Sequence, residues 1–298
     1  MISIIITAFK EADSVRKAII KFRNQLNWPK EHNFYELLVV APDRETELVC
    51  EEFKGVRYIK DPGVGKPAAL NIAFREAKGE ILVLTDGDVY PNQYAIRELS
   101  KFFSHSQKVG AVSGRPRSIN SRNNILGYWS HLLVDMADQT RRKCTKERKS
   151  IVCTGYLYAV SKKAIEGMNM PEDILSDDAY ISYYIENRGF KILYAAGAQI
   201  FVKYPSTFSD WIKQKARSTG GYTQLEQLHV APKNPMRGFK QEAKEIITIF
   251  KYARNLKEFM WTGMLVLARI YLWLRIYYER RLKNKSFEQT WVRINSTK

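Results

Sequence analysis

Two aspartates separated by one glycine stand directly after an apolar run. Residues 81–88 read Ile-Leu-Val-Leu-Thr-Asp-Gly-Asp. The run predicts a buried parallel strand, which would bring Asp86 and Asp88 to the carboxyl edge of a sheet, where α/β proteins bind ligands. Gly87 would let the backbone turn there without a side chain in the way. Two carboxylates at such an edge suit a divalent cation held against a diphosphate. The alternative is an ordinary polar turn.

A glycine-rich segment places a lysine at the start of a predicted helix. Residues 61–67 read Asp-Pro-Gly-Val-Gly-Lys-Pro. This is not a P-loop, because Pro67 replaces the required Ser or Thr and Lys60 stands where the first glycine should be. The segment predicts either a turn that presents Lys66 to a diphosphate near a helix N-terminus, or an ordinary loop with a solvated lysine.

Two more pairs of polar residues fall on predicted helices. Asp177 and Asp178 precede a helix, where acids interact favourably with the helix dipole. Alternatively, one of them is a general base whose pKa is tuned by partial burial. Gln214 and Arg217 are three positions apart and share a helix face. That face would either clamp a phosphate or simply be solvated.

The elements that must position these residues alternate between strand and helix up to about residue 115. Such alternation argues for a parallel α/β sheet. Beyond residue 120 the alternation loosens, and a hinge is predicted at His229–Gly238. The predicted strands are Ile2–Thr7, Leu37–Val40, Val56–Ile59, Ile81–Thr85, Val109–Ser113, Ile151–Ser161, Ile192–Tyr194 and Gln199–Val202. The predicted later helices are Asn123–Arg142, Asp177–Asn187, Phe208–Leu228 and two within about Phe239–Lys285.

The composition bounds the class of protein. With 298 residues and 45% apolar content, the chain can form one large domain, or one domain with an appendage. Its 3 cysteines are an odd number without metal-ligand spacing, which favours a reducing compartment. The segment Met1–Ile4 has no basic leader and predicts a first strand rather than a signal peptide. We therefore expect a cytoplasmic catalytic region.

The charge is strongly basic and uneven. The formal net charge is +17, and residues 201–298 hold 19 Lys and Arg against 7 Asp and Glu. Such a region attracts nucleic acid, anionic lipid or phosphorylated substrates, unless it is merely a soluble basic surface. A nucleic-acid-binding protein would explain the charge but not the carboxylates at a strand end, and no recognised binding motif is present.

An aromatic and aliphatic stretch lies in this basic region. Phe259–Tyr278 is long enough to span a bilayer core. Arg269 in its middle would cost about 2.5–3.5 kcal/mol on insertion scales, and Arg275 would add to that. The pattern therefore favours a helix lying in the membrane interface, with flanking basic residues on anionic lipid. The alternative is packing onto the catalytic domain or a dimer partner.

In order and spacing, the motifs resemble those of family 2 glycosyltransferases with the GT-A fold, from Ile2 to about Gln224. Ser218 stands where the family's QxxRW motif has tryptophan, which argues against a processive polysaccharide synthase. Asp43 stands where the family usually has paired acids for the nucleobase. The stretches that carry the resemblance are Ile4–Glu11, Val39–Asp43, Gly65–Asn71, Asp86–Asp88, Gly155–Val160, Asp177–Asp178 with Ile185–Ile192, and Gln214–Arg217.

The resemblance implies a Rossmann-like, mainly parallel sheet flanked by helices. It implies a GT-A catalytic domain at 1–228, divided at about residue 115 into a nucleotide-sugar half and an acceptor half. A helical, membrane-associating appendage would occupy 239–285. The implied nucleotide-sugar residues are Thr7, Ala8, Glu11, Asp43, Lys66, Asp86, Gly87 and Asp88. The implied metal ligands are Asp86 and Asp88, for Mn²⁺ or Mg²⁺. The implied catalytic residues are Asp178 and Asp177, and the implied phosphate or acceptor residues are Gly155, Gln214 and Arg217.

The implied reaction is an inverting transfer from a UDP- or GDP-sugar. In a single displacement, Asp178 removes a proton from the acceptor hydroxyl as it attacks the anomeric carbon. A polyprenyl phosphate or lipid-linked saccharide is the expected acceptor, and a growing exopolysaccharide chain is the alternative. An acceptor that is already an ionised phosphate needs no base, and Asp178 would then orient it. A sugar-phosphate nucleotidyltransferase has a similar sheet, but the chain lacks its glycine-rich N-terminal nucleotide loop.

The basic, aromatic tail and the expected lipid acceptor together predict where in the cell the enzyme acts. We expect the enzyme on the cytoplasmic side of the cell membrane, either peripheral or tail-anchored, with an anionic membrane surface as partner. Homo-oligomerisation stays open, and no nucleic acid is expected as a partner.

Overall fold

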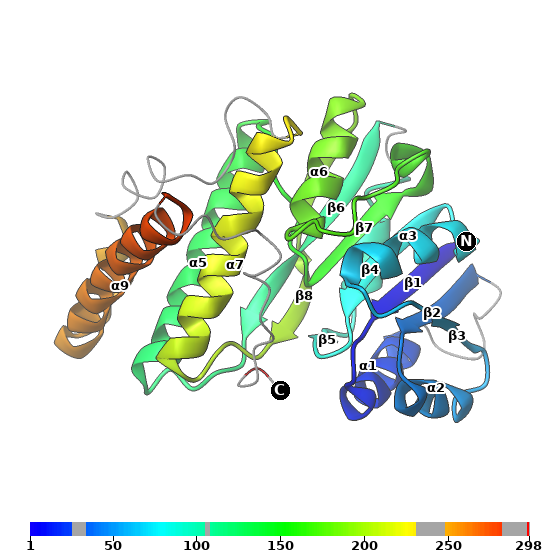
Figure 1. Ribbon diagram of the computed structural model, residues 1–298, viewed down its shortest axis with the longest axis horizontal. Helices are drawn as coiled ribbons and strands as arrows, with labels where there is room; N and C mark the ends of the chain where they lie inside the picture. The colour runs from blue at the N-terminus through cyan, green and yellow to red at the C-terminus, as the bar shows by residue number, and fades with distance from the viewer. Residues whose placement is uncertain (26–33, 105–107, 231–247, 282–296, 298) are drawn as a thin grey trace. The chain divides into compact units, whose positions relative to one another are not determined.

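The computed structural model describes residues 1–298 except 26–33, 105–107, 231–247, 282–296 and 298 (Figure 1). The chain divides into two compact units. The first contains Met1–Pro116 and Arg141–Val202, and the second contains Arg117–Thr140 and Lys203–Lys298.

The first unit is built on a mixed sheet. Its strand order is β3-β2-β1-β4-β7-β6-β8-β5 in the described part of the chain. The strands are β1 Ile2–Thr7, β2 Tyr35–Ala41, β3 Val56–Lys60, β4 Ile81–Asp86, β5 Tyr90–Pro91, β6 Val109–Ser118, β7 Leu157–Ser161 and β8 Lys191–Val202.

The parallel strands end at a common edge. Strand β1 pairs in parallel with β2 and β4, and β2 pairs in parallel with β3. The register places Thr7 beside both Val40 and Asp86. Strand β7 runs antiparallel to both β4 and β6, so β6 points the same way as β4. Helices flank the sheet, with α1 and α2 on one side of the parallel strands and α3 on the other (Figure 1).

The helices have the following bounds. They are α1 Ala12–Gln25, α2 Arg44–Glu51, α3 Lys66–Glu76, α4 Ala95–Ser100, α5 Ile125–Lys146, α6 Asp177–Asn187, α7 Phe208–Gln227 and α9 Leu256–Arg281, with a short 3-10 helix at Lys162–Ile165.

Two differences between the predicted and the observed strands have a local physical cause. The predicted strand Ile151–Ser161 forms only from Leu157, because backbone amides before it bind side chains instead of a neighbouring strand. Cys153 N donates to Ser182 Oγ at 3.0 Å and Thr154 N donates to Ser113 Oγ at 3.1 Å.

The second difference is in β8, which is one continuous strand rather than two short ones. Its small central residues interrupt the apolar pattern because α4 packs against the strand there. A Cβ on Gly197 would lie 2.5 Å from Glu98 Oε2.

The second unit contains α7, α9 and most of α5. One face of α9 packs into a shared core with these two helices. The buried members of this core are Leu126, Tyr128, Trp129, Leu132, Trp211, Ile212, Leu265, Ala268, Leu272 and Ile276. The predicted hinge lies outside the described residues from position 231 onward, and so does the predicted appendage at 239–247 and 282–285. The predicted domain boundaries therefore stay predictions.

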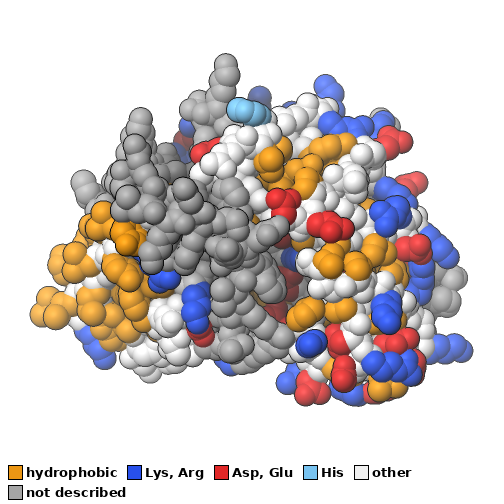
Figure 2. Space-filling model, in the orientation of Figure 1, with side chains coloured by type: hydrophobic (Ala, Val, Ile, Leu, Met, Phe, Trp, Pro, Cys, Tyr) orange, Lys and Arg blue, Asp and Glu red, His pale blue; other side chains and the backbone are white. Residues whose placement is uncertain are grey.

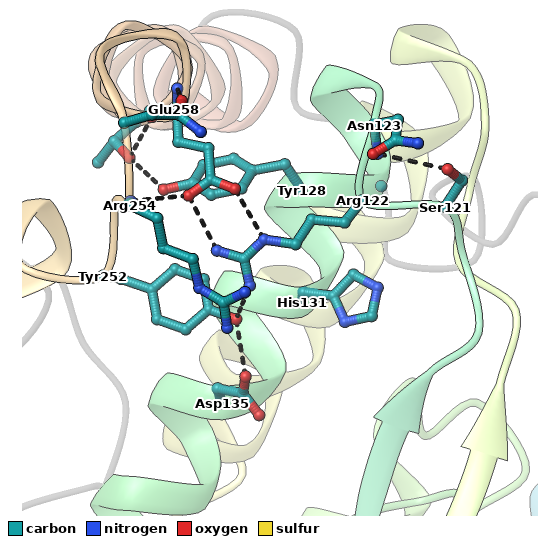
Figure 3. A network of polar contacts seen from close by, with 12 residues as sticks. Ser121, Arg122, Asn123, Tyr128, His131, Asp135, Tyr252, Arg254 and Glu258 are labelled. Carbon is teal, nitrogen blue, oxygen red and sulfur yellow. Dashed lines mark hydrogen bonds and ion pairs between the residues drawn. The ribbon is translucent and has the colours of Figure 1, made fainter.

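A polar network holds the start of α9 in the second unit (Figure 3). Arg122 donates to both carboxylate oxygens of Glu258, at 2.8 and 3.0 Å, and to Tyr252 Oη at 3.0 Å. Tyr252 in turn donates to Asp135 Oδ2 at 2.7 Å. The Arg122 guanidinium holds the pKa of Glu258 below its usual value. The network therefore fixes the first turn of α9 by charge-assisted hydrogen bonds.

Candidate active site

The carboxyl edge of the parallel strands brings the first predicted residues together. Gly87 N donates to Thr7 O at 3.0 Å, so the turn after β4 lies against the end of β1. A Cβ on Gly87 would stand 2.9 Å from Val15 Cγ2 and 3.1 Å from Ala8 Cβ. Only glycine fits this close approach, and it is what lets Asp86 and Asp88 flank the edge.

Asp88 and Glu11 share a neighbourhood. Burial, together with the nearby charges of Asp88 and Glu11, raises the pKa of Tyr90 on β5 above its ordinary value. Glu11 Oε1 also accepts a hydrogen bond from Phe9 N at 3.2 Å. It would lie 3.5 Å from a Cβ on Gly87. The predicted residues of the β1 loop thus lie beside the Asp-Gly-Asp turn.

Lys66 connects two segments that are far apart in sequence. It begins α3 after Gly65, whose φ of 135° lies in the region that favours glycine. Lys66 Nζ lies 2.5 Å from Asp86 Oδ1 and 3.4 Å from Asp177 Oδ2. Burial opposes its charge, but the carboxylates of Asp177 and Asp86 outweigh burial and raise the pKa of Lys66. The lysine is therefore a cation held by two carboxylates at the edge of the sheet, with its side chain 28% exposed.

The two acids of α6 have different surroundings. Asp178 Oδ1 accepts hydrogen bonds from Ser176 Oγ at 2.7 Å and from its neighbour's amide, Ala179 N, at 2.9 Å. Its other oxygen, Oδ2, would lie 3.3 Å from a Cβ on Gly155. Asp177 Oδ2 is buried and has no hydrogen-bond partner among the described residues. Asp178 is thus oriented by its own helix, whereas Asp177 is held by the charge of Lys66.

Asp43 is built into the scaffold at the end of β2. It caps α2 by accepting from Thr46 N at 3.0 Å, and its second oxygen accepts from Lys10 N at 2.9 Å. Burial favours the neutral form, but these bonds and the one from the Thr46 hydroxyl hold the pKa of Asp43 below its usual value. The residue ties the ends of β1 and β2 together, and its predicted nucleobase contact stays a prediction.

A second buried acid, Asp61, is not among the site residues predicted from the sequence. It follows β3, accepts from Gly63 N at 2.6 Å and is only 6% exposed. Burial and the nearby charge of Asp43 raise its pKa. It follows the strand Val-Arg-Tyr-Ile-Lys, which lacks the continuous apolar run that singled out Asp86.

The predicted phosphate clamp lies in the second unit. Gln214 and Arg217 are on α7 and are both half-buried. Because the predicted donor residues belong to the first unit, the clamp stays a prediction.

The chemistry of the edge suits a cation shared with a ligand. Within the described residues, no group of three or more His, Cys, Asp or Glu could hold a metal ion. Asp86 already accepts a cation, the Lys66 ammonium, so its carboxylate is directed at positive charge. With Asp88 it offers two hard oxygen ligands. Mg²⁺ and similar ions are commonly bound by one or two carboxylates together with substrate phosphates.

The fold and the acid-lined sheet edge are those of a GT-A-like protein. The family model described as "Glycosyltransferase like family 2" matches residues 1–221, and the chain belongs to this family.

Two curated relatives match a large part of the chain. One is a probable glycosyltransferase, YdaM, of Bacillus subtilis, which is 27% identical over 261 residues, or 83% of this chain and 60% of that protein. Another is a poly-beta-1,6-N-acetyl-D-glucosamine synthase of Staphylococcus aureus, which is 27% identical over 164 residues, or 54% of this chain and 40% of that protein. The chain thus spans 60% of the length of the first relative and 40% of the second.

A solved structure has a similar fold. It is a mannosyltransferase from Pyrobaculum calidifontis in complex with GDP-Man and Mn²⁺, with a TM-score of 0.61 and 19% identity. The match covers 97% of this chain and 82% of that one. At this identity the likeness shows the fold alone.

Proposed function

We propose that the protein is an inverting glycosyltransferase that moves a sugar from a UDP- or GDP-sugar to a polyprenyl phosphate or lipid-linked saccharide. One observation carries the proposal. Lys66 lies between Asp86, at the end of a parallel strand, and Asp177, at the start of α6. A cation between two carboxylate-bearing segments at a sheet edge is suited to a diphosphate and its reacting sugar.

On the donor side, Lys66 would stabilise the negative charge that develops on the departing diphosphate. Asp86 and Asp88 would hold Mn²⁺ or Mg²⁺, which supplies further charge neutralisation when bound. The buried acids Asp43 and Asp61 lie at the ends of β2 and β3, and we assign the nucleoside to this part of the edge. The GDP-Man of the structural neighbour makes a GDP-sugar one of the two donors to test.

On the acceptor side, Asp178 would remove the proton of the attacking hydroxyl. Its carboxylate is oriented by the bonds from Ser176 and from the amide of Ala179. Gly155 places no side chain against its Oδ2, whereas a Cβ there would lie 3.3 Å from that oxygen. Direct attack on the anomeric carbon inverts its configuration, by the geometry that governs inverting glycosidases. With an ionised phosphate acceptor, Asp178 would orient that group.

We also assign α9 to the cytoplasmic surface of a membrane. Of the described residues, one helix, Leu256–Ile276, is long and apolar enough to cross a bilayer. Its buried side packs against α5 and α7, however, so only its other side is available to lipid. Among the described side chains of α9, none on that side is acidic, since Glu258 is buried. The exposed apolar side chains there, each at least 48% exposed, are Leu256, Phe259, Met260, Met264, Leu267, Ile270, Tyr271, Leu274 and Tyr278.

Figure 2 shows apolar side chains gathered over α9. The chain's charge of +17 complements an anionic surface. We therefore place α9 flat in the interface, as amphipathic helices lie, and not as an isolated span.

The membrane assignment is tested with substitutions, because truncation would remove part of the second unit's core. Leu267→Glu with Leu274→Glu should abolish binding to vesicles of phosphatidylcholine and phosphatidylglycerol. Ile20→Glu changes an exposed apolar residue on α1 and is the control. Wild-type binding should weaken with salt, since charge is screened over about 8–10 Å at physiological ionic strength. If the double variant binds vesicles like wild type, lipid does not occupy this face. A concentration-dependent dimer that the same pair disrupts would assign the face to a second copy.

A growing exopolysaccharide chain is the second candidate acceptor. The relative named as a polysaccharide synthase favours it, whereas Ser218 in place of the motif's tryptophan argues against processive synthesis.

The deciding experiment offers UDP- and GDP-sugars with polyprenyl phosphate, lipid-linked saccharide or free oligosaccharide. We expect one transfer per lipid acceptor, with inversion at the anomeric carbon. Retention, or no transfer from any donor to any acceptor, would refute the proposed reaction.

A further inference from the structure

Five buried side-chain atoms in the described part of the first unit lack a hydrogen-bond partner, and two of them, on Tyr158 and Asp177, belong to residues near the Lys66 cluster. Tyr158 on β7 is fully buried, and its hydroxyl has no hydrogen-bond partner in the described part of the chain. Asp177 Oδ2 is likewise buried and without one there, although it lies 3.4 Å from Lys66 Nζ. Leaving such groups unpaired costs free energy, so both call for a physical explanation.

The sheet register places the tyrosine beside Asp86, one of the two acids that Lys66 contacts. Leu84 on β4 pairs with Tyr158 on β7. Since side chains alternate along a strand, Asp86 shares the face of Leu84 and is a diagonal neighbour of Tyr158. Diagonal neighbours are within reach of an aromatic side chain. Burial and the carboxylates of Asp177, Asp178 and Asp86 raise the pKa of Tyr158 well above its ordinary value. Its hydroxyl therefore keeps its proton and is a hydrogen-bond donor.

Under the proposed function, Lys66 must serve both the protein's carboxylates and the ligand's diphosphate. The inference about Tyr158 that follows rests on this proposed function. In the structure the Lys66 ammonium neutralises Asp86 and Asp177. A bound diphosphate would compete for the same ammonium, and a metal ion would take over Asp86. Asp177, whose side chain is 16% exposed, would then have a buried carboxylate oxygen without its lysine, which is unfavourable unless another donor compensates.

We propose that Tyr158 is a positioning residue that donates a hydrogen bond to Asp177 when Lys66 engages the donor diphosphate. The tyrosine lets the lysine transfer from protein to ligand without leaving a buried charge uncompensated. Its hydroxyl is unpaired in the ligand-free protein because Lys66 still neutralises Asp177.

The test is a double-mutant cycle read by calorimetric binding of UDP and GDP in the presence of Mg²⁺. Tyr158→Phe should weaken binding of the preferred nucleotide roughly 10-fold, the order expected for a hydrogen bond to a charged group. In an Asp177→Asn background the same change should have no effect, because the amide carries no charge to compensate. The ligand-free Tyr158→Phe protein should melt at or above the wild-type temperature, because it loses a hydroxyl that made no bond.

Tyr183→Phe is the matched control. Tyr183 is 2% exposed on α6 and lies five and six positions after the two acids, on another side of the helix. Loss of the Tyr183 hydroxyl should leave nucleotide binding unchanged.

Two outcomes would overturn the role of Tyr158. If Tyr158→Phe lowers nucleotide affinity equally in the wild-type and Asp177→Asn backgrounds, Tyr158 is a core residue only. If it lowers the affinity in neither background, the assignment also fails. If wild type binds neither UDP nor GDP, the proposed function itself fails. If wild type binds one but the cycle shows no coupling, only the role of Tyr158 fails.

Discussion

Gly155→Ala should slow the reaction by moving the proposed base. An alanine Cβ there would lie 3.3 Å from Asp178 Oδ2 and 3.5 Å from its Cγ, closer than ordinary van der Waals contact to the oxygen. The carboxylate must then shift by a few tenths of an ångström. A misplacement of 1 Å can cost roughly 100-fold in rate. A shift of only a few tenths of an ångström should therefore lower kcat by a smaller factor, about 4- to 10-fold.

The assay compares kcat and the donor KM for wild type, Gly155→Ala and a control. The control is Gly263→Ala, since nothing lies within 4 Å of a Cβ added at Gly263 on α9. It should keep wild-type kcat in a detergent assay with an acceptor that carries a hydroxyl group. Gly155→Ala should keep its donor KM and its melting temperature, because the change touches only the carboxylate. A wild-type kcat for Gly155→Ala would refute the placement of Asp178 against the reacting hydroxyl.

Four further outcomes are expected. Asp88→Asn should nearly abolish transfer, and wild-type activity should vanish in chelator and return with Mn²⁺ or Mg²⁺; full activity in excess chelator would contradict the metal assignment. Asp178→Asn should lower turnover to a hydroxyl acceptor by about 10²- to 10⁴-fold with donor affinity little changed, and a defect confined to donor affinity would place it on the nucleotide side. Arg217→Ala should weaken phosphate engagement, and its combination with Gln214→Ala should be less than additive if the two act as one clamp; strict additivity would make them separate surface residues. Glu258 has a pKa lowered from 4.5, so its stabilisation is complete above that pH and is lost as the pH falls through the lowered value. The difference in Tm between wild type and Glu258→Gln should therefore shrink in acid, and a constant difference would argue against the ion pair.

Local sequence patterns predicted the first half of the fold well. The strand at Ile2–Thr7 has the predicted bounds, and the strand before Asp86 ends within one residue of its prediction. Both contain a run of at least three consecutive apolar residues, a pattern that is local in the sequence. The irregular segment before β7 could not be predicted this way, because its amides bind the hydroxyls of Ser113 and Ser182, which are distant in sequence.

The candidate site was predictable as a set of residues but not as an arrangement. Motif order singled out Lys66, Asp86 and Asp177, yet nothing in sequence shows that one lysine lies between the two acids. That contact depends on α3 and α6 meeting the same sheet edge. Tyr158 escaped notice for a related reason, since a tyrosine within an apolar strand looks like core until its unpaired hydroxyl is seen beside carboxylates.

The central claim is that Lys66 and its two acidic partners form the donor site of a glycosyltransferase. Its most direct measurement is the release of nucleoside diphosphate from a panel of UDP- and GDP-sugars by wild type and by Lys66→Met. Wild type should release the diphosphate from at least one donor, and Lys66→Met should lose most of that activity while still folding, with a lower melting temperature because two carboxylates lose their cation. A folded Lys66→Met protein that cleaves the donor at the wild-type rate would contradict the account.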